Sequence, residues 1–274
     1  MNFMGNRRAQ FRFCKRPVSG KVLAMGIFDG QVVIVTGGGA GIGAAASHLL
    51  ASRGAQVIVA DVVKSNAEAV ADAITKAGGK ATARELNVAD QVGVQKFIDG
   101  VVKDFGKIDA IANSAGIVGP TNTPLEKITA ADIEKVLSVN LLGAIWLTQA
   151  ALPHMKAAKY GRIVHVASIA GKEGNPGMTP YVLSKSAMIG FVKAIAKEVA
   201  TEGITINSIA PAVIKTPMNA NTSEETLKYM ISRIPMGRLG EAEEVAEMIS
   251  FAVSKACSFT TGFCFDTSGG RATY

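Results

Sequence analysis

The 274-residue chain is 48% hydrophobic and 19% charged, which is ample for a buried core. No continuous apolar run reaches the length of a membrane-spanning helix, so we expect no membrane partner. Cys14, Cys257 and Cys264 are too few and too scattered for a disulfide framework or a metal site, so we expect a cytoplasmic protein without a bound metal.

The net charge of +7 is concentrated at the start of the chain. The basic residues that precede the first acidic residue, Asp29, are Arg7, Arg8, Arg12, Lys15, Arg16 and Lys21. Without them, 23 basic and 22 acidic residues remain. A nearly neutral body offers no surface for a polyanion, so we expect no nucleic-acid partner.

Residues 1–25 form a basic extension without a clear hydrophobic period. Three interpretations are open: a disordered tail, an arginine-rich targeting peptide, or a segment that is not part of the native chain. We favour the third, because Met25 leads directly into the first expected strand. We expect one catalytic domain over residues 26–274.

Short apolar runs alternate with helical patterns along this domain. The expected elements, in chain order, are a strand at 31–36, a helix from the following glycine loop to about 53, a strand at 56–60, a helix at 64–77, a strand at 80–86, a helix at 90–105, a strand at 108–113, a long helical region at 129–158 with a break near Pro153, a strand at 161–167, a helix at 179–200, a strand at 204–209, an irregular stretch at 211–240, a helix at 241–253 and a short strand at 262–266. Continuously apolar strands that alternate with helices predict an α/β fold. We expect a doubly wound, mostly seven-stranded parallel sheet with helices on both faces.

A glycine loop follows the first strand, with Gly37, Gly41, Ile42 and Gly43 in a G-x-x-x-G-x-G spacing. Glycines at this point allow a tight turn and the close approach of a pyrophosphate, and the next helix N-terminus favours an anion. The alternative is a turn that serves helix–strand packing alone.

Asp61 ends the second strand, about 20 residues after the loop, where an acid binds the ribose hydroxyls of a dinucleotide. Its carboxylate repels a 2′-phosphate, so we expect NAD as the cofactor. NADP remains possible through Lys64.

Tyr181 and Lys185 are four residues apart at the start of a helix and therefore share one face. The ordinary pKa of a phenol is about 10, and a neighbouring cation lowers it. Ser168 follows a buried strand and can donate a hydrogen bond to a substrate oxygen. The three side chains together supply an acid/base and a polarising donor for an alcohol oxygen. The alternative is a tyrosine and a lysine on a solvated helix face.

Taken together, these residues resemble the short-chain dehydrogenase/reductase family from about residue 26 to 274. The matching segments are Thr36–Gly43, Asn113–Gly116, Asn140, Ser168, Tyr181 with Lys185, and Pro211–Thr216. Ser114 and Ala212 depart from the family pattern, and Asn87-Val88 stands where the family usually has Asp-Val. The resemblance implies a Rossmann-type fold with a cofactor site made by Gly37, Gly41, Ile42, Gly43, Asp61, Asn87, Val88, Asn113, Ala115, Gly116, Tyr181, Lys185, Pro211, Ile214 and Thr216.

The resemblance also implies hydride transfer between nicotinamide and a carbinol carbon. Tyr181 is then the general acid/base, Lys185 lowers its pKa, Ser168 holds the substrate oxygen, and Asn140 keeps a water behind Lys185. Asn140 can instead be a capping or core amide. The resemblance implies a substrate lid in the irregular stretch after Thr216; residues 212–240, which include it, are here called the lid segment. It also implies assembly as a homotetramer or homodimer through helices corresponding to about 129–158 and 179–200.

The substrate is less determined than the reaction. One hypothesis is an NAD-dependent dehydrogenase of a secondary alcohol, polyol, sugar derivative or cyclic diol. A second is an NADPH-dependent 3-oxoacyl-thioester reductase, with Arg233 and Arg238 near the pocket mouth. A third is a nucleotide-binding sensor without catalysis. Outside these motifs, we expect His165 to be a satisfied core histidine, and the terminal segment 269–274 either to reach a neighbouring subunit or to fray.

Overall fold

The computed structural model describes residues 26–219 and 222–274. The interpretations of residues 1–25 lie outside the described residues. Within the described part, seven strands form one sheet in which every neighbouring pair is parallel. Their order across the sheet is β3 (Lys80–Glu85), β2 (Gln56–Asp61), β1 (Val32–Thr36), β4 (Ala110–Asn113), β5 (Gly161–Val166), β6 (Ile204–Pro211) and β9 (Cys264–Thr267). The predicted sheet is confirmed.

The chain leaves β1 toward β2 and β3 on one side and later continues through β4 to β9 on the other. Doubly wound sheets bind ligands at the carboxyl ends of the strands where this reversal occurs. Thr36, the last residue of β1, is in register with Ala60 and Asn113. The carboxyl ends of β1, β2 and β4 therefore meet at one edge.

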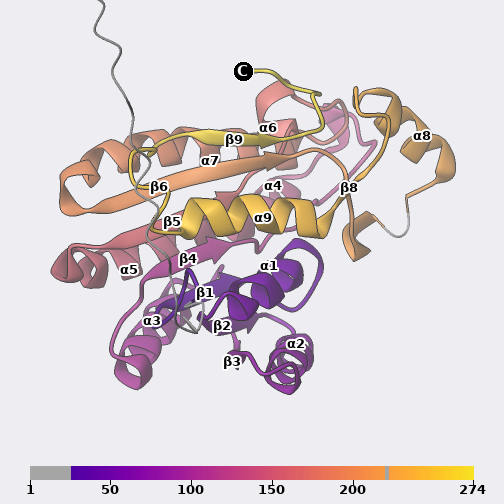
Figure 1. The fold of residues 1–274 in the computed structure, drawn as a ribbon. Coiled ribbons are helices and arrows are strands. Elements are labelled where there is room, and N and C mark those ends of the chain that lie inside the picture. Colours follow the sequence, from indigo (N-terminus) through magenta and orange to yellow (C-terminus); the bar gives the residue numbers. More distant parts are fainter. Residues whose placement is uncertain (1–25, 220–221) are drawn as a thin grey trace, which may run out of the picture.

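Helices cover both faces of the sheet (Figure 1). One layer holds α1 (Gly41–Ser52), α2 (Lys64–Lys76) and α9 (Ala242–Val253), and the other holds α3 (Gln91–Phe105), α5 (Gly143–Ala158) and α7 (Thr179–Glu198). Alternating β1 residues supply both cores, because Val33 and Val35 face the first layer while Val32 and Ile34 face the second. Burial on both faces explains why the strands read as continuous apolar runs.

The long helical region does break, but not at Pro153, which lies inside α5. The interruption is a π-helical turn, η2 (Ser138–Leu142), between α4 (Ala130–Leu137) and α5. By length and hydropathy alone, the helical stretch Ala130–Ala158 meets the criteria for a membrane span, as a core helix of a globular domain also can. Its residues Leu147, Ala151 and Met155 pack against the sheet as part of the domain core.

The lid segment contains more regular structure than expected. It holds a two-stranded parallel pair, β7 (Ile214–Lys215) and β8 (Gly240–Glu241), and a helix, α8 (Glu224–Ser232). Ser223 caps α8 by accepting a hydrogen bond from the Thr226 backbone N–H, yet no side chain of α8 is buried. The remaining short helical turns are η1 (Leu125–Lys127), α6 (Ala170–Glu173), η3 (Ala200–Glu202) and η4 (Pro217–Asn219).

Candidate active site

The glycine loop forms a cradle at the carboxyl end of β1. Gly37 has a φ of +61°, and a Cβ there would lie 2.8 Å from the backbone nitrogen of Ala115. A Cβ on Gly43 would lie 2.1 Å from the Gly37 carbonyl oxygen. Side chains are therefore sterically excluded at both positions, and the loop lies against the Asn113–Gly116 segment. Ile42 packs on the core beneath, and this bare backbone fits a dinucleotide pyrophosphate.

Asp61 borders the cradle as predicted. Its carboxylate accepts hydrogen bonds from the backbone N–H groups of Gly39 and Val63, each at 3.0 Å. Lys64, the cation that offered a route to NADP, points to Glu68 with its Nζ 3.5 Å from Oε1. A carboxylate without its own cation at this position suits ribose hydroxyls and disfavours a phosphate.

The far wall of the crevice comes from the segment after β6. Ile169 donates its N–H to the carbonyl of Pro211 at 2.9 Å, and Ile214 is buried. Thr216 packs over Gly41, because a Cβ on that glycine would lie 3.2 Å from Thr216 Cγ2. The predicted residues from the glycine loop and from Pro211–Thr216 are thus brought together.

Asn87 and Val88 lie just after β3, next to the end of β2. Asn87 is exposed, and its Oδ1 accepts the Ala89 N–H at 3.1 Å. Val88 is buried against Gly143 of α5. Its side chain therefore has a packing role, whereas the Asn87 amide is available at the crevice edge.

Tyr181 and Lys185 share a face of α7, with Lys185 Nζ 5.6 Å from the centre of the Tyr181 ring. Ser168, two residues beyond β5, forms a side-chain hydrogen bond with Tyr181. Lys185 Nζ donates to the carbonyl oxygen of Val166 at 2.7 Å. The predicted trio is therefore assembled at the carboxyl end of β5, with Ser168 and Lys185 both buried.

The electrostatics of the trio differ from the expectation. Burial raises the pKa of Tyr181 above its ordinary value, and the hydrogen bond with Ser168 acts in the opposite direction. Burial also lowers the pKa of Lys185 to about 8. Among the protein groups, the hydrogen bond with Ser168 is thus the one that favours the phenolate of Tyr181, and the expected lowering by Lys185 is not found.

Asn140 sits in the π-helical turn and is fully buried. Its Oδ1 accepts the Ile117 N–H at 2.8 Å, while its Nδ2 donates to the Ile117 carbonyl at 2.9 Å and to Ser184 Oγ at 3.0 Å. Gly116 lies beside it, since a Cβ there would be 3.3 Å from Asn140 Oδ1 and 3.4 Å from Lys185 Nζ. Asn140 therefore joins the Asn113–Gly116 segment to the helix that carries Tyr181 and Lys185. π-Turns of this kind are frequent at functional sites.

A buried polar chain beneath the crevice was not predicted as a unit. Thr36 Oγ1 donates to Asn113 Oδ1 at 2.6 Å, Asn113 Nδ2 lies 3.0 Å from His165 Nδ1, and His165 Nε2 lies 3.1 Å from Thr148 Oγ1, which donates to the Ala144 carbonyl. Burial, assisted by Lys185, lowers the pKa of His165 to about 3. A neutral imidazole protonated on Nε2 satisfies every member of the chain. The prediction that His165 is a satisfied core histidine is confirmed, and its place as the single polar residue within the apolar run 163–167 was the available signal.

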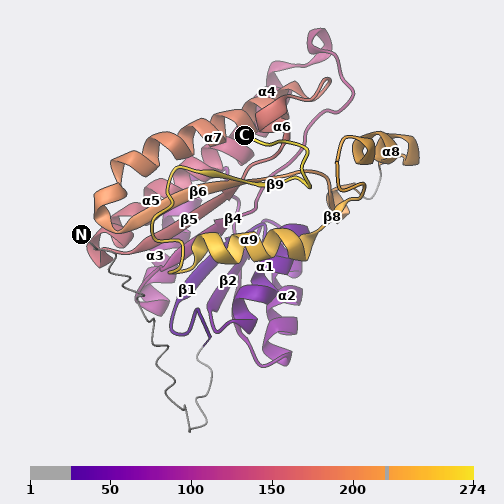
Figure 2. The ribbon, with the colours of Figure 1, turned by 45° about the horizontal axis from the view of Figure 1, so that its top comes forward.

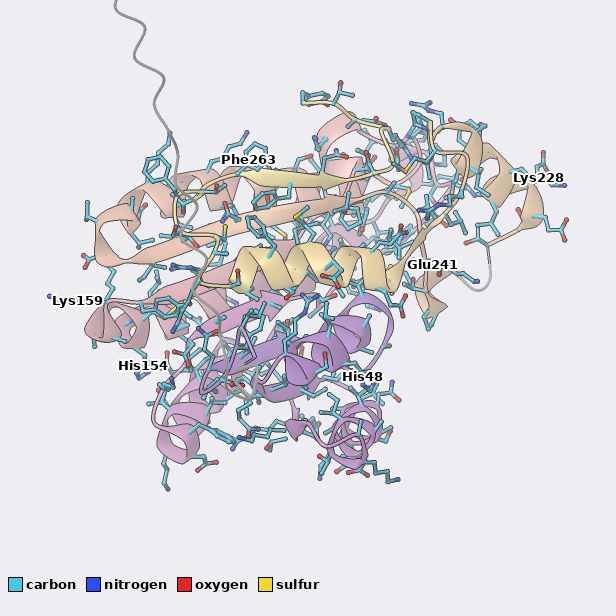
Figure 3. All side chains as sticks on the ribbon, in the orientation of Figure 1. His48, His154, Lys159, Lys228, Glu241 and Phe263 are labelled. Atoms are coloured by element: carbon cyan, nitrogen blue, oxygen red, sulfur yellow. The ribbon has the colours of Figure 1, made fainter. Side chains whose placement is uncertain are left out.

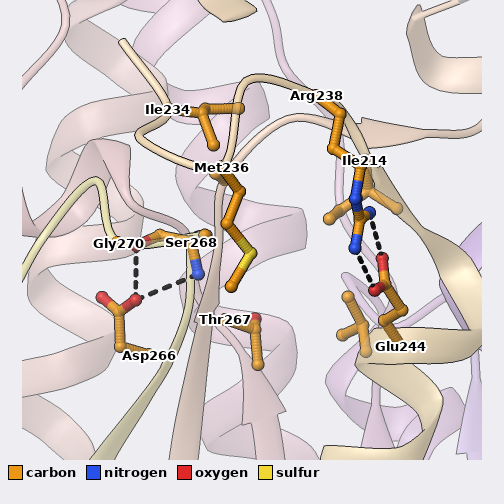
Figure 4. Close-up of a pocket in the computed structure, with 13 residues that line it drawn as sticks. Ile214, Ile234, Met236, Arg238, Glu244, Asp266, Thr267, Ser268 and Gly270 are labelled. Carbon is orange, nitrogen blue, oxygen red and sulfur yellow. Dashed lines mark hydrogen bonds and ion pairs between the residues drawn. The ribbon is translucent and has the colours of Figure 1, made fainter.

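The lid segment and the end of β9 enclose a cavity of about 320 Å³ (Figure 4). Arg238 and Glu244 form a two-point ion pair at one end, with contacts of 2.8 and 2.6 Å. Met236 and Thr267 lie between this pair and Asp266, which accepts from Ser268. Arg238 is therefore already paired, whereas Arg233 is half exposed and lies 3.8 Å from Glu173.

Neither of the other histidines is near this site. Figure 3 shows His48 and His154 on separate helices at the surface. Within residues 26–219 and 222–274, no group of three or more His, Cys, Asp or Glu side chains is arranged to hold a metal ion.

Comparison with known proteins agrees with this geometry. A family model described as short chain dehydrogenase matches residues 31–227. The 3-oxoacyl-(acyl-carrier-protein) reductase FabG of Thermotoga maritima is 38% identical over 88% of this chain and 98% of its own length. The 2-dehydro-3-deoxy-L-rhamnonate dehydrogenase (NAD(+)) of a Sphingomonas species is 39% identical, over 91% and 98%.

A cyclohexanol dehydrogenase of an Acinetobacter species is 37% identical, over 88% of this chain and 95% of the relative. The crystal structure of gox2181 superimposes with a TM-score of 0.87 at 30% identity, covering 89% of this chain and 96% of that one. Fold, site and relatives agree, and the chain belongs to the short-chain dehydrogenase family, as an oxidoreductase that acts on an alcohol or a ketone.

Proposed function

We propose that the protein is an NAD-dependent dehydrogenase of a secondary alcohol or its ketone, with a polyol, sugar derivative or cyclic diol as the substrate class. The observation that carries the proposal is the Ser168–Tyr181–Lys185 cluster facing a glycine cradle bordered by Asp61. The relatives named for a sugar-acid dehydrogenase and for cyclohexanol dehydrogenase support this substrate class.

In the direction of alcohol oxidation, each side chain has a separate role. Ser168 holds the substrate oxygen, and Tyr181 removes the hydroxyl proton. Nicotinamide, when bound, accepts the hydride from the carbinol carbon. Lys185 orients the ribose beside Tyr181, while Asn140 fixes the position of the Lys185 helix relative to Gly116. Asn140 has three protein hydrogen bonds, so we assign it a positioning role in addition to any bound water.

We infer NAD rather than NADP from the surroundings of Asp61. Its carboxylate lies within hydrogen-bond distance of the glycine loop, and the neighbouring Lys64 is directed at Glu68. We infer the same cofactor contacts for Asn87, Asn113, Ala115, Pro211 and Ile214 as the family resemblance implies, because these residues border the crevice.

A second candidate is an NADPH-dependent 3-oxoacyl-thioester reductase, favoured by the 38% identity to the Thermotoga maritima reductase. The two arginines expected at the pocket mouth for a phosphopantetheine carrier are both paired, Arg238 with Glu244 at 2.6 Å and Arg233 with Glu173 at 3.8 Å. This leaves less positive charge for a carrier than the sequence suggested.

We also propose a homotetramer or homodimer in the cytoplasm. Leu142 and Leu183, on the helices expected to form the interface, are 38% and 47% exposed, and partner helices would cover them. The free thiols of Cys257 and Cys264 are compatible with a reducing compartment.

The test is a screen of NAD reduction over secondary alcohols, polyols and dihydrodiols, run beside acetoacetyl-thioester reduction with NADPH. We expect turnover of an alcohol with NAD. Turnover confined to the thioester with NADPH would establish the second candidate, and nucleotide binding without any turnover would leave a sensor.

A further inference from the structure

The C-terminal strap, residues 266–274, folds back on its own chain and crosses α6. Figures 1 and 2 both show the C-terminus beside this short helix. Ala272 of the strap is 7% exposed, so the segment is packed and not frayed. These contacts favour a docked segment over a frayed one for residues 269–274, and the reach to a neighbouring subunit stays a prediction.

Two ion pairs attach the strap to α6. Lys172 Nζ lies 2.9 Å from Asp266 Oδ2, and Arg271 Nε lies 2.9 Å from Glu173 Oε2. The side chains of Lys172 and Arg271 are only 6% and 7% exposed. Ion pairs so shielded from water are costly to break, because each leaves a charge without its partner.

Hydrogen bonds and a cation–π contact reinforce this attachment. The hydroxyl of Tyr274 donates to the Lys172 carbonyl at 2.5 Å, and the Lys172 ammonium lies 4.9 Å from the centre of the Tyr274 ring. Arg271 also donates to Asn175 Oδ1 at 3.1 Å. The strap thus holds three successive points of the connection between β5 and α7.

On its other side, α6 touches the catalytic helix and the catalytic serine. A Cβ on Gly171 would lie 2.7 Å from the Lys185 carbonyl carbon, and Ser186 Oγ donates to the Gly171 carbonyl at 2.9 Å. The Ala170 N–H donates to Ser168 Oγ at 3.1 Å. Any displacement of α6 therefore moves Ser168 relative to Lys185.

The same strap contacts the lid segment. Met236 donates its N–H to the Gly269 carbonyl at 3.1 Å, and Gly269 lies against Ile234. Arg233, at the end of α8, lies 3.8 Å from the same Glu173 oxygen that Arg271 binds. The lid segment and α6 are consequently joined through one C-terminal element.

We propose that the C-terminal strap sets the position of Ser168 and the lid for substrate binding, with Arg271 and Asp266 as positioning residues. The inference rests on the proposed role of Ser168. It concerns the alcohol side of the crevice, because Arg271 and Tyr274 make their hydrogen bonds to residues 172–175, whereas the base of the strap, at Thr267, pairs with Pro211 of the cofactor wall. A loosened strap should weaken alcohol turnover and leave NAD binding intact.

The test uses the full chain with Arg271→Met, which keeps an unbranched apolar stem and removes the charged guanidinium. We expect kcat/KM for the alcohol to fall about tenfold or more, since small misplacements of reacting groups are expensive. The dissociation constant for NAD should stay within about twofold of wild type. Arg271→Lys, which retains the charge opposite Glu173, should recover part of the loss.

Arg53→Met is the matched control. Arg53 pairs with Glu247 at 2.7 Å between α1 and α9, away from α6, so its loss should leave kcat/KM unchanged. If Arg271→Met is poorly folded, Tyr274→Phe removes a single hydroxyl contact and should show a smaller effect of the same kind. The proposal is overturned if Arg271→Met and Tyr274→Phe both keep the wild-type kcat/KM for the alcohol. It is also overturned if NAD affinity falls as much as kcat/KM does, or if kcat/KM is no higher in Arg271→Lys than in Arg271→Met. The proposed function is tested separately by Tyr181→Phe, which should lose alcohol activity whether or not the strap has a positioning role.

Discussion

The catalytic centre and the lid segment are held in place in different ways. Asn140, Lys185 and Ser168 are 0%, 4% and 9% exposed, and each has a hydrogen-bond partner in the protein. In the lid segment, no side chain of α8 is buried, and Met236 is 68% exposed. A buried, hydrogen-bonded polar side chain can be replaced by few other residue types, whereas an exposed segment can vary widely in sequence. This difference explains why the reaction is determined more sharply than the substrate.

The strongest test of the proposed catalytic centre is Tyr181→Phe, which removes the hydroxyl that we propose transfers the proton and keeps the ring. We expect kcat to fall by about 10²–10⁴-fold, the usual contribution of a positioned acid/base. Isothermal titration should show unchanged NAD binding. Residual activity near the wild-type level would remove Tyr181 from this role.

A smaller effect is expected in the pH dependence of stability when Lys185 is replaced by Met. The Lys185 pKa falls from 10.5 to about 8 on folding, so between these values the unfolded chain binds a proton that the folded chain lacks. The lysine contribution to stability should therefore be constant below pH 8 and rise with pH above it, by about 3 kcal/mol at most. Urea unfolding at several pH values measures the difference between wild type and variant, with Lys193→Met on the exposed face of α7 as control. A difference that does not change between pH 8 and 10 would contradict the prediction.

Asn140→Ala tests the buried amide that links the two halves of the site. It leaves both backbone groups of Ile117 and the Ser184 hydroxyl without this partner, which should cost about 1–3 kcal/mol of unfolding free energy. Turnover should fall as well. Ser184→Ala removes one of these contacts and should lower the thermal unfolding temperature less. If the two variants are equally destabilised, the bonds from Asn140 to Ile117 do not contribute to stability.

Asp61→Ala tests the cofactor border. Without the carboxylate, the ratio of kcat/KM for NADP to that for NAD should rise about tenfold, because a repulsive charge near the 2′-phosphate is removed. Lys64→Ala should leave this ratio unchanged, since Lys64 is directed at Glu68. If the ratio stays at the wild-type value in Asp61→Ala as well, Asp61 does not determine the choice between NAD and NADP.

The smallest effect is expected from the lid segment with Met236→Ala. Met236 lines the cavity beside Ile214 and is largely exposed. Its loss should alter the ranking of alcohols by less than about tenfold, the effect of one modest apolar contact. NAD affinity should not change. A collapse of all activity would show the lid segment to be as constrained as the catalytic centre.

The sequence alone was sufficient for the doubly wound sheet and for choosing Ser168, Tyr181 and Lys185 as a cluster, while their catalytic roles stay predictions. Continuous apolar strands carry their own signal, and helical spacing places Tyr181 and Lys185 on one face wherever the helix lies. The position of the helix break was wrong, because proline is a visible signal at 153 while the π-turn at Asn140 depends on its contacts with Ile117 and Ser184.

Only the tertiary structure showed what surrounds these groups. The pKa of Tyr181 depends on burial and on Ser168, thirteen residues away in the chain, and the ion pairs of α6 join residues about a hundred positions apart. Local sequence patterns report periodicity and turn chemistry, which act over a few residues. Desolvation and the pairing of distant charges arise only when the chain has folded, so the candidate site residues could be named from the sequence while their electrostatics and the contacts of the C-terminal strap with α6 could not.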